Sequence, residues 1–432
     1  MMEHFLLIAG KRVQLNFITG KLVLATLLFI LVALVTAWLG INHYRARQAL
    51  YDEMKDVYLL RLQRAMVYAE TAVDLNRPPE KLSVLARGVG ERYGSVAKLR
   101  GKYGPITIAS REKSNFLLVV MQRLDFATLA ALLLSLLGVF FAHHAVAGER
   151  EEGTLALTLS HALPRYKLIL AEYLATLISV FVPFCFGWGV FLLIIEFKAP
   201  YLLTDDAGSR CVLFFLASLI FTTSFVGLGV LASVLSRQAI TALLMAFLGW
   251  VGLVIVHPAL SAWAARVMVP LRSETVSFSD LTVFELAEQV DEPALTPSEL
   301  DDDYVNRNFE QAHLASAIEQ ISPYGSFLAL AQILTRTDIG SVGRFYRQAR
   351  QANDQLRIWQ EAKLRQYPKR ETFYAGDWGP LDINGIPQPI FREESLRESM
   401  MRAITPALSL CVWAILTWAF SLVIFLRYDV RA

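Results

Sequence analysis

The sequence is short of charged residues and of cysteines. Asp, Glu, Lys and Arg make up 19% of its 432 residues, whereas about 25% is usual in soluble domains. The three cysteines, Cys185, Cys211 and Cys411, lie in or beside apolar stretches, which argues against a disulfide framework or a cysteine metal site. The net charge is only +2, from 41 basic and 39 acidic residues, so no nucleic-acid partner is indicated. These shortages exclude an ordinary soluble enzyme, a disordered chain and a disulfide scaffold.

Charge is missing altogether from six long stretches. They are Leu22–Asn42, Phe126–Gly148, Tyr173–Ile195, Cys211–Ser236, Gln238–Ala265 and Ala403–Leu426. About 20 residues of helix cross a bilayer, so each stretch predicts a transmembrane helix. The first could be taken for a signal peptide, but it has no small-residue cleavage site and is interpreted as an uncleaved span. The fold class predicted is an all-α membrane protein with six spans.

The spans divide the chain into segments of very unequal length. We place span one at 22–42, span two at 126–148, spans three to five within 173–257 and span six at 403–426. Two long connections, 43–125 and 258–402, then lie on one side of the membrane. The termini, 1–21 and 427–432, lie on the other side with the connection 149–172.

Basic residues in short connections mark the cytoplasmic side. With cytoplasmic termini, nine of them lie inside and two, Lys198 and Arg210, lie in the short outer connection. The nine are Lys11, Arg12, Lys21, Arg150, Arg165, Lys167, Arg237, Arg427 and Arg431. We therefore predict that both termini are cytoplasmic and both long loops extracytoplasmic.

The segments outside the spans are predicted to be mainly helical. Residues 3–18 have the pattern of an amphipathic helix on the inner membrane surface, or of a ragged start to span one. In the first loop the pattern predicts a helix from Leu50 that ends at Pro78–Pro79, a short helix over Lys81–Gly90 and an extended stretch over Gly94–Ile108. The second loop predicts helices over Tyr304–Ile321, Tyr324–Leu334 and about Ser341–Tyr367.

Catalytic signatures are absent from the sequence. It contains no His-Glu-x-x-His zinc motif, no Gly-x-Ser-x-Gly elbow and no Gly-x-x-x-x-Gly-Lys-Ser/Thr phosphate loop. His143 and His144 could ligate a metal or relay protons, but histidines near lipid headgroups are the plainer interpretation. No catalytic residue, metal ligand or cofactor site is predicted. The charge-free stretches argue against ion-coupled transport, so any energy for movement must come from outside the chain.

The connection between spans two and three carries the clearest signal. It begins Gly148, Glu149, Arg150, Glu151, Glu152, Gly153, Thr154, Leu155, and Leu157 and Leu159 continue the apolar pattern until Pro164 and Arg165. Acidic residues favour the N-terminal end of a helix. This predicts a short amphipathic helix at the inner surface, whose apolar side needs either lipid or a protein partner.

The same residues resemble the signature of type-2 ABC exporter permeases, in the group that includes the nitrous-oxide-reductase maturation and gliding-motility permeases. The matching residues are Gly148–Leu155, Leu157, Leu159–Ser160, Arg165 and the run Leu168–Ala175. The chain departs from the family pattern at Ala162–Arg165, where the proline is displaced, and at Ala171–Glu172, where Gly-Lys is common. The run Gly227–Arg237, with Trp250 after it, is a weaker match.

The resemblance implies a function for the inner connection. The family's equivalent segment is a coupling helix that docks into a cytoplasmic ATPase, which gives that role here to Glu149, Arg150, Glu151, Glu152, Gly153, Thr154, Leu155, Leu157 and Arg165. It also implies a bacterial cytoplasmic membrane, two permease chains, identical or different, and two ABC ATPases, which would bind the ATP and Mg²⁺ that this chain does not bind itself. The expectation is an exporter permease. The alternatives are a mechanotransmitter that reshapes outer domains without transport, and a membrane-anchored scaffold or sensor.

Overall fold

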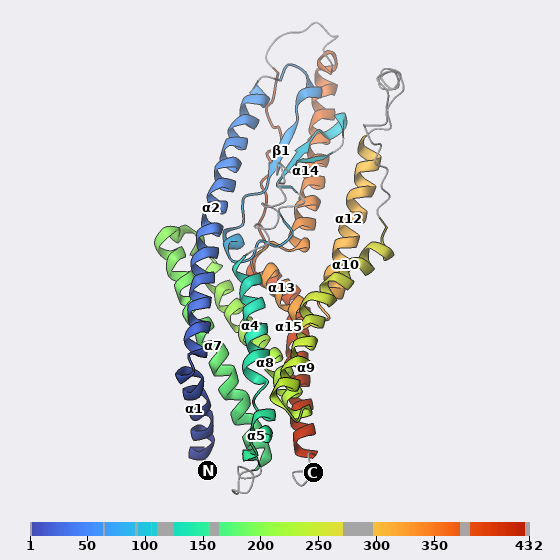
Figure 1. Cartoon of the computed structure of the whole chain (residues 1–432). Coiled ribbons are helices and arrows are strands. Elements are labelled where there is room, and N and C mark those ends of the chain that lie inside the picture. Colours follow the sequence, from blue (N-terminus) through green and yellow to red (C-terminus); the bar gives the residue numbers. More distant parts are fainter. Residues whose placement is uncertain are drawn as a thin grey trace, which may run out of the picture.

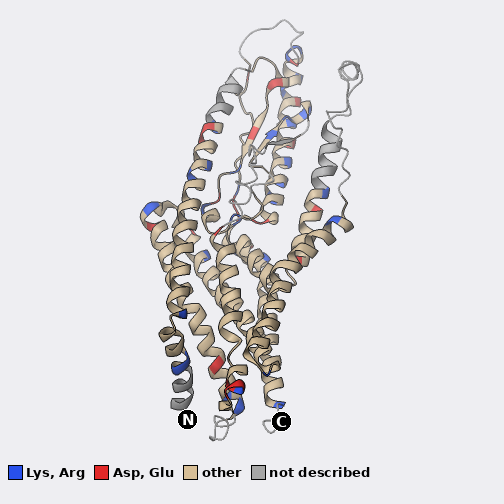
Figure 2. Ribbon diagram, viewed as in Figure 1, with Lys and Arg blue, Asp and Glu red and all other residues tan. Residues whose placement is uncertain are grey.

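The computed structural model describes residues 2–63, 65–90, 94–104, 106–109, 125–155, 164–270, 297–371 and 381–427. Figure 1 shows a long helical bundle with both chain termini at one end, here called the inner end, and a smaller mixed domain at the opposite, outer end. Lys, Arg, Asp and Glu gather mostly toward the two ends and over the outer domain, while the middle of the bundle is almost free of them (Figure 2).

In the part of the chain that the structure describes, six helices are long and apolar enough to cross a membrane, as predicted. Span one is the first part of α2 (Lys21–Gln63), and span two is α4 (Phe126–Ala142) with the short α5 (Ala147–Glu151). Spans three and four are α7 (Arg165–Lys198) and α8 (Ala207–Leu235). Span five joins α9 (Ala239–Val251), a π-helical turn (Gly252–Val256) and α10 (His257–Met268), and span six is α15 (Leu396–Arg427). The chain is therefore a multi-pass membrane protein.

Aromatic side chains fill the outer half of the bundle core. Phe126 stacks on Phe191 with ring centroids 4.3 Å apart, and Phe221 stacks on Phe327 at 4.5 Å. Phe327 belongs to α13 (Pro323–Leu334), a short apolar helix that packs against α8 and α15. The core of the spans therefore continues without a break into the first layer of the outer structure.

The N-terminal segment forms a separate helix, α1 (Met2–Ile18), which packs along α7. It is divided from α2 at Gly20, whose φ of 73° is unfavourable for residues with a side chain. Asn16 donates a 3.0 Å hydrogen bond to Ser179 of α7. The predicted N-terminal helix is present. Its Arg12 and Asn16 side chains hydrogen-bond to other helices of the bundle.

The outer domain contains a sheet, so the all-α prediction is corrected there. Strands β1 (Val73–Asn76), β2 (Val96–Leu99) and β3 (Thr107–Ala109) form an antiparallel sheet in that order, with Val73 opposite Leu99 and Val96 opposite Ala109. In β1 buried and half-buried side chains alternate, the two-residue period of a strand with one face covered.

Two predictions for the first loop are wrong. The helix from Leu50 ends at Gln63, well before Pro78, and the residues before that proline form β1. Lys81–Val84 is one 3-10 turn in place of a helix to Gly90. Long-range packing decides both segments: Val73 and Leu75 share an apolar core with α14, whereas Leu82 and Val84 belong to the core of the bundle, where this turn contacts α2. The extended stretch after Gly94 contains β2 and β3, as predicted.

In the described part of the second loop, three helices belong to the outer structure. They are α12 (Pro297–Glu319), α13 and α14 (Ile339–Gln366); α13 and α14 match the predicted bounds closely, and α12 begins before the predicted Tyr304. Helix α14 places Phe345, Ala349 and Leu356 on the sheet. Its buried Gln360 donates to the backbone oxygens of Thr71 and Arg100, both at 3.2 Å, which joins the sheet edge to the helix.

Charged side chains close the outer end of the bundle in a cluster that we call the outer junction: Asp206, Arg210, Arg336, Asp338, Glu394 and Arg402. Arg210 on α8 is 1% exposed and donates to Asp206 (2.9 Å), the Leu334 carbonyl (2.9 Å) and Ser399 (3.0 Å). Arg402 on α15 pairs with Asp338 and Glu394. Arg336 reaches Asp206 at 2.8 Å. The junction thus ties α8 and α15 to the helices of the outer domain.

Replacing Arg210 should test the importance of the junction. We expect Arg210→Met to lower the free energy of unfolding by about 3–5 kcal/mol, because it leaves buried acceptors without their donor. Thermal unfolding of the full chain in detergent measures the loss. The control is Arg237→Met, which changes an exposed arginine just beyond the other end of α8 and should shift stability by less than about 0.5 kcal/mol. Equal melting of both variants would contradict the prediction.

Candidate functional site

The predicted coupling residues lie at the inner end of the bundle, beside the two termini (Figure 1). Residues 147–155, here called the docking segment, comprise α5 and the turn after it. Glu151, Glu152, Gly153 and Thr154 are exposed, whereas Leu155 is 4% exposed and packs among apolar residues of α7 and α8. The segment therefore presents an acidic surface outward and anchors itself by an apolar residue.

The first anchor of the docking segment is the end of α8. The backbone N–H groups of Val146 and Ala147 both donate to Ser233, each at 2.9 Å, and all three residues are buried. Arg150 donates to the carbonyls of Val234 (2.9 Å) and Ser236 (2.8 Å). The last carbonyls of a helix have no partner within the helix, so Arg150 satisfies groups that α8 leaves open.

The second anchor is the start of α9. Glu151 accepts a 2.9 Å hydrogen bond from the backbone N–H of Ala239, the first residue of that helix. A carboxylate at a helix N-terminus is favourable because N–H groups point outward there. Arg150 and Glu151, adjacent in sequence, therefore clamp the two sides of the corner between spans four and five. The docking segment is thus hydrogen-bonded to the end of α8 and to the start of α9.

The turn after α5 brings the chain back toward the bundle. Gly153 has a φ of 72°, the left-handed conformation that ends many helices and favours glycine. The Thr154 hydroxyl donates a 3.3 Å hydrogen bond to the carbonyl of Glu149. Glu149 is itself half-buried. Gly153 and Thr154 thus shape the turn that lifts the exposed acids away from the core.

One predicted coupling residue, Arg165, lies apart from this segment. Arg165 begins α7 and donates to the carbonyl of Leu426, near the end of α15, at 3.2 Å. Leu157 lies outside the described residues, as does the rest of the predicted helix to Leu163. The structure therefore places Glu149 to Leu155 together, and it places Arg165 at the start of span three, in contact with the end of span six.

An ion pair near the docking segment escaped the prediction from sequence. Glu172 of α7 is 3% exposed, and its carboxylate lies 3.1 Å from the guanidinium of Arg12 on α1. Arg12 also donates to the carbonyl of His144 at 2.8 Å. The sequence did contain a hint of this pair. The chain has Ala171–Glu172 where the family commonly has Gly-Lys, and a buried acid at that position needs a cation nearby. The pair links α1, α7 and the end of α4.

His143 and His144 show no sign of a metal site. The described residues include no group of three or more His, Cys, Asp or Glu placed to hold a metal ion. The His144 ring lies so close to Gly148 that an added Cβ would come within 2.0 Å of it. Gly148 is thus required for close packing, which gives a structural reason for the first glycine of the segment.

The family of the chain follows from comparison with known proteins. The model of the ABC-2 family transporter proteins matches residues 7–430, so the chain belongs to that family. No curated protein matches the sequence. Members are membrane permease components of ABC transporters, typically without catalysis of their own, and normally work with a cytoplasmic ABC ATPase. The family therefore agrees with the six spans, and the resemblance seen in residues 148–155 is confirmed at family level.

The anchoring of the docking segment by Ser233 can be tested directly. In Ser233→Ala the buried N–H groups of Val146 and Ala147 lose their acceptor, at a cost of about 1–3 kcal/mol. We expect at least about tenfold faster hydrogen exchange of these two amides. Ser224→Ala is the matched control on α8, because that hydroxyl contacts only carbonyls. Unchanged exchange in Ser233→Ala would show that the segment is held by other contacts.

Proposed function

We propose that the chain is the permease of an ABC exporter and that its docking segment receives a separate cytoplasmic ABC ATPase. The observation that carries this proposal is the rigid attachment of an exposed acidic turn to the α8–α9 corner. An exposed segment held by side chains on both sides can transmit force, whereas a loose loop cannot. ATP and Mg²⁺ would be bound by the partner. Kinship with the nitrous-oxide-reductase maturation and gliding-motility permeases is part of the proposal and rests on residues 148–155.

Two permease chains and two ATPases would form the working complex. In spans two and four, 56% of the most apolar stretch is buried within this chain. In spans five and six the buried share of that stretch is only 22%. Large apolar side chains such as Leu244, Leu248 and Trp263 of span five are exposed. Such a face needs lipid or a second permease, identical or different, and the family resemblance favours a pair.

Mechanotransmission is a second candidate function, and the path of α8 favours it. The inner end of this helix holds the docking segment through Ser233, and its outer end enters the outer junction through Arg210. A displacement imposed by ATP at the inner end could therefore reach the outer domain without any substrate crossing. ATP-dependent movement of the outer domain with no solute transfer in sealed vesicles would single out this function.

Loss of ATPase binding tests the main proposal. The full chain, tagged and co-expressed with the ABC ATPase encoded beside it, should retain that ATPase on purification in mild detergent. Glu152→Arg reverses an exposed charge of the docking segment and should reduce the bound ATPase at least about tenfold. An acidic segment is expected to meet a basic surface of the ATPase, and an arginine would be repelled by that surface. The double variant Glu149→Ala with Glu151→Ala should behave alike.

The matched control for this experiment is Glu361→Arg, an exposed glutamate on α14 at the opposite end of the molecule. It should retain the ATPase at the level of the parent chain. If the parent chain binds no ATPase in any condition, the permease proposal fails, and a scaffold or sensor function takes its place.

The proposed orientation places the docking segment in the cytoplasm of a bacterium and the outer domain outside the cytoplasmic membrane. Because the three native cysteines lie within the spans, new ones can be labelled selectively. We expect Glu361→Cys to react with a membrane-impermeant maleimide in intact spheroplasts and Glu152→Cys to react only after permeabilisation. The parent chain, treated identically, gives the background. The reverse pattern would invert the topology and place the ATPase site outside.

A further inference from the structure

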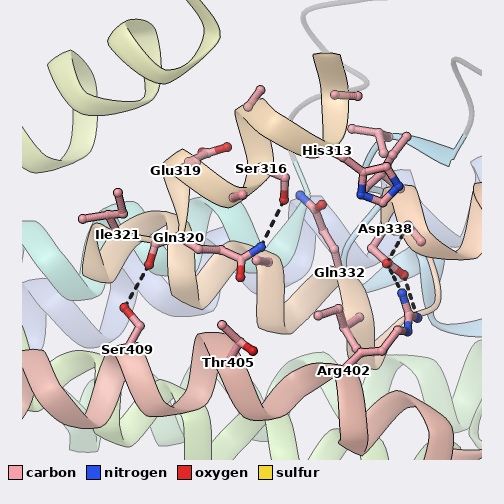
Figure 3. A pocket seen from close by; sticks show the side chains of 18 of the residues that line it. His313, Ser316, Glu319, Gln320, Ile321, Gln332, Asp338, Arg402, Thr405 and Ser409 are labelled. Carbon is pink, nitrogen blue, oxygen red and sulfur yellow. Dashed lines mark hydrogen bonds and ion pairs between the residues drawn. The ribbon is translucent and has the colours of Figure 1, made fainter. Parts of the chain in front are cut away.

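A large cavity lies between α12, α13 and α15 near the outer end of the bundle (Figure 3). Its volume is about 920 Å³, at the upper end of the range for small-molecule sites. Apolar side chains on its walls include Ile321, Ile333, Val412, Trp413 and Leu416. We call it the α12–α15 cavity. It is distant in sequence and in the fold from the docking segment.

The cavity has an apolar end and a polar end along α15. Val412 and Leu416, 51% and 44% exposed, lie within the membrane-spanning part of the helix, while Arg402 lies near its outer end. At 1.5 Å per residue, Arg402 and Leu416 are separated by about 21 Å along the helix. This is about half of a bilayer that measures ~40–45 Å with its headgroups. The cavity therefore matches one leaflet in length and in polarity.

Several polar groups in the cavity still have hydrogen-bonding capacity. Among the described residues, the side chains of His313, Gln332 and Thr405 have no hydrogen-bond partner. Gln320, in contrast, donates to Ser316 at 3.2 Å, and Ser409 donates to the Gln320 carbonyl at 2.9 Å. Figure 3 shows His313 on α12, Gln332 on α13 and Thr405 on α15, so the open groups come from all three walls. They are suited to the donors and acceptors of a headgroup.

The charges of the cavity do not favour an anionic headgroup. Among the lining residues that the structure describes, Arg402 is the only Lys or Arg, and it is already paired with Asp338 and Glu394. Glu319 adds a further carboxyl, and its burial raises the pKa of that group. Within the described lining, a phosphate that carried a net negative charge would thus find no uncompensated cation, whereas a zwitterionic headgroup with an ammonium can use the Asp338 carboxylate and the neutral groups.

We propose that the α12–α15 cavity binds a zwitterionic membrane lipid from the adjoining leaflet. Its acyl chains lie beside Val412, Trp413 and Leu416, and its headgroup contacts Gln332, Thr405 and the Arg402–Asp338 pair. The occupant follows from three observations: the apolar end lies along the membrane-spanning part of α15, the cavity is about one leaflet long, and the charge of its described lining is compensated. The proposal does not depend on ATPase docking and can fail or hold separately from it.

Lipid retention by the purified full chain tests the proposal. The chain is delipidated in detergent, incubated with palmitoyl-oleoyl phosphatidylethanolamine or the corresponding phosphatidylglycerol, and weighed by native mass spectrometry. We expect one phosphatidylethanolamine to be retained per chain, and retention of phosphatidylglycerol to be lower by about tenfold or more. Thr405→Trp and Ala329→Trp, which fill the cavity from opposite walls, should each abolish retention.

Ile415→Trp is the matched control, since Ile415 is exposed on α15 but does not line the cavity. It should retain the lipid like the parent chain, and all variants should keep the parent melting temperature in lipid-free detergent. The proposal is overturned if no lipid is retained, if phosphatidylglycerol is retained equally well, or if both cavity variants still bind lipid. It is also overturned if those variants only convert a dimer to monomers, because a second chain would then occupy the cavity.

Discussion

The buried guanidinium of Arg210 is the constraint on which the outer half of the structure depends. A charge taken out of water is tolerated only where ion pairs and hydrogen bonds replace its hydration. Here Asp206, the Leu334 carbonyl and Ser399 supply them, from three separate parts of the chain. Helices α8, α13 and α15 must therefore meet in one arrangement. The outer domain is consequently carried by the spans themselves.

Helix α8 connects this junction with the inner surface. Its 29 residues span about 43 Å, and it contacts α4, α9 and α15 along that length. At the inner end, Ser233 and the last carbonyls hold the docking segment. The second outer loop and the inner acidic turn are thus attached to the same helix. This arrangement suits an ABC-2 family permease in which energy enters at one end and shape changes at the other.

Sequence patterns predicted the local features well and the long-range ones poorly. Helices α13 and α14 were predicted because the spacing of apolar residues along each segment is enough to indicate a helix. Strand β1 was missed, because Val73 and Leu75 are buried by α14, more than 250 residues away in the chain. The pairing of Arg12 with Glu172 depends on the packing of α1 on α7, which joins residues 160 positions apart. Likewise, nothing in the sequence distinguishes Ser233 from the other small residues of span four. Only the fold shows that its hydroxyl accepts hydrogen bonds from two backbone amides.

The sequence alone determined the six spans, the family and the position of the acidic docking segment, since each depends on residues adjacent in the chain. Hydropathy over about 20 residues decides whether a helix can cross a bilayer, whatever its neighbours are. Only the tertiary structure decided which charges are paired, which segment becomes a strand and where a leaflet-sized cavity lies. Those features arise from contacts between segments that are distant in sequence, where burial and hydrogen-bond satisfaction outweigh local preference.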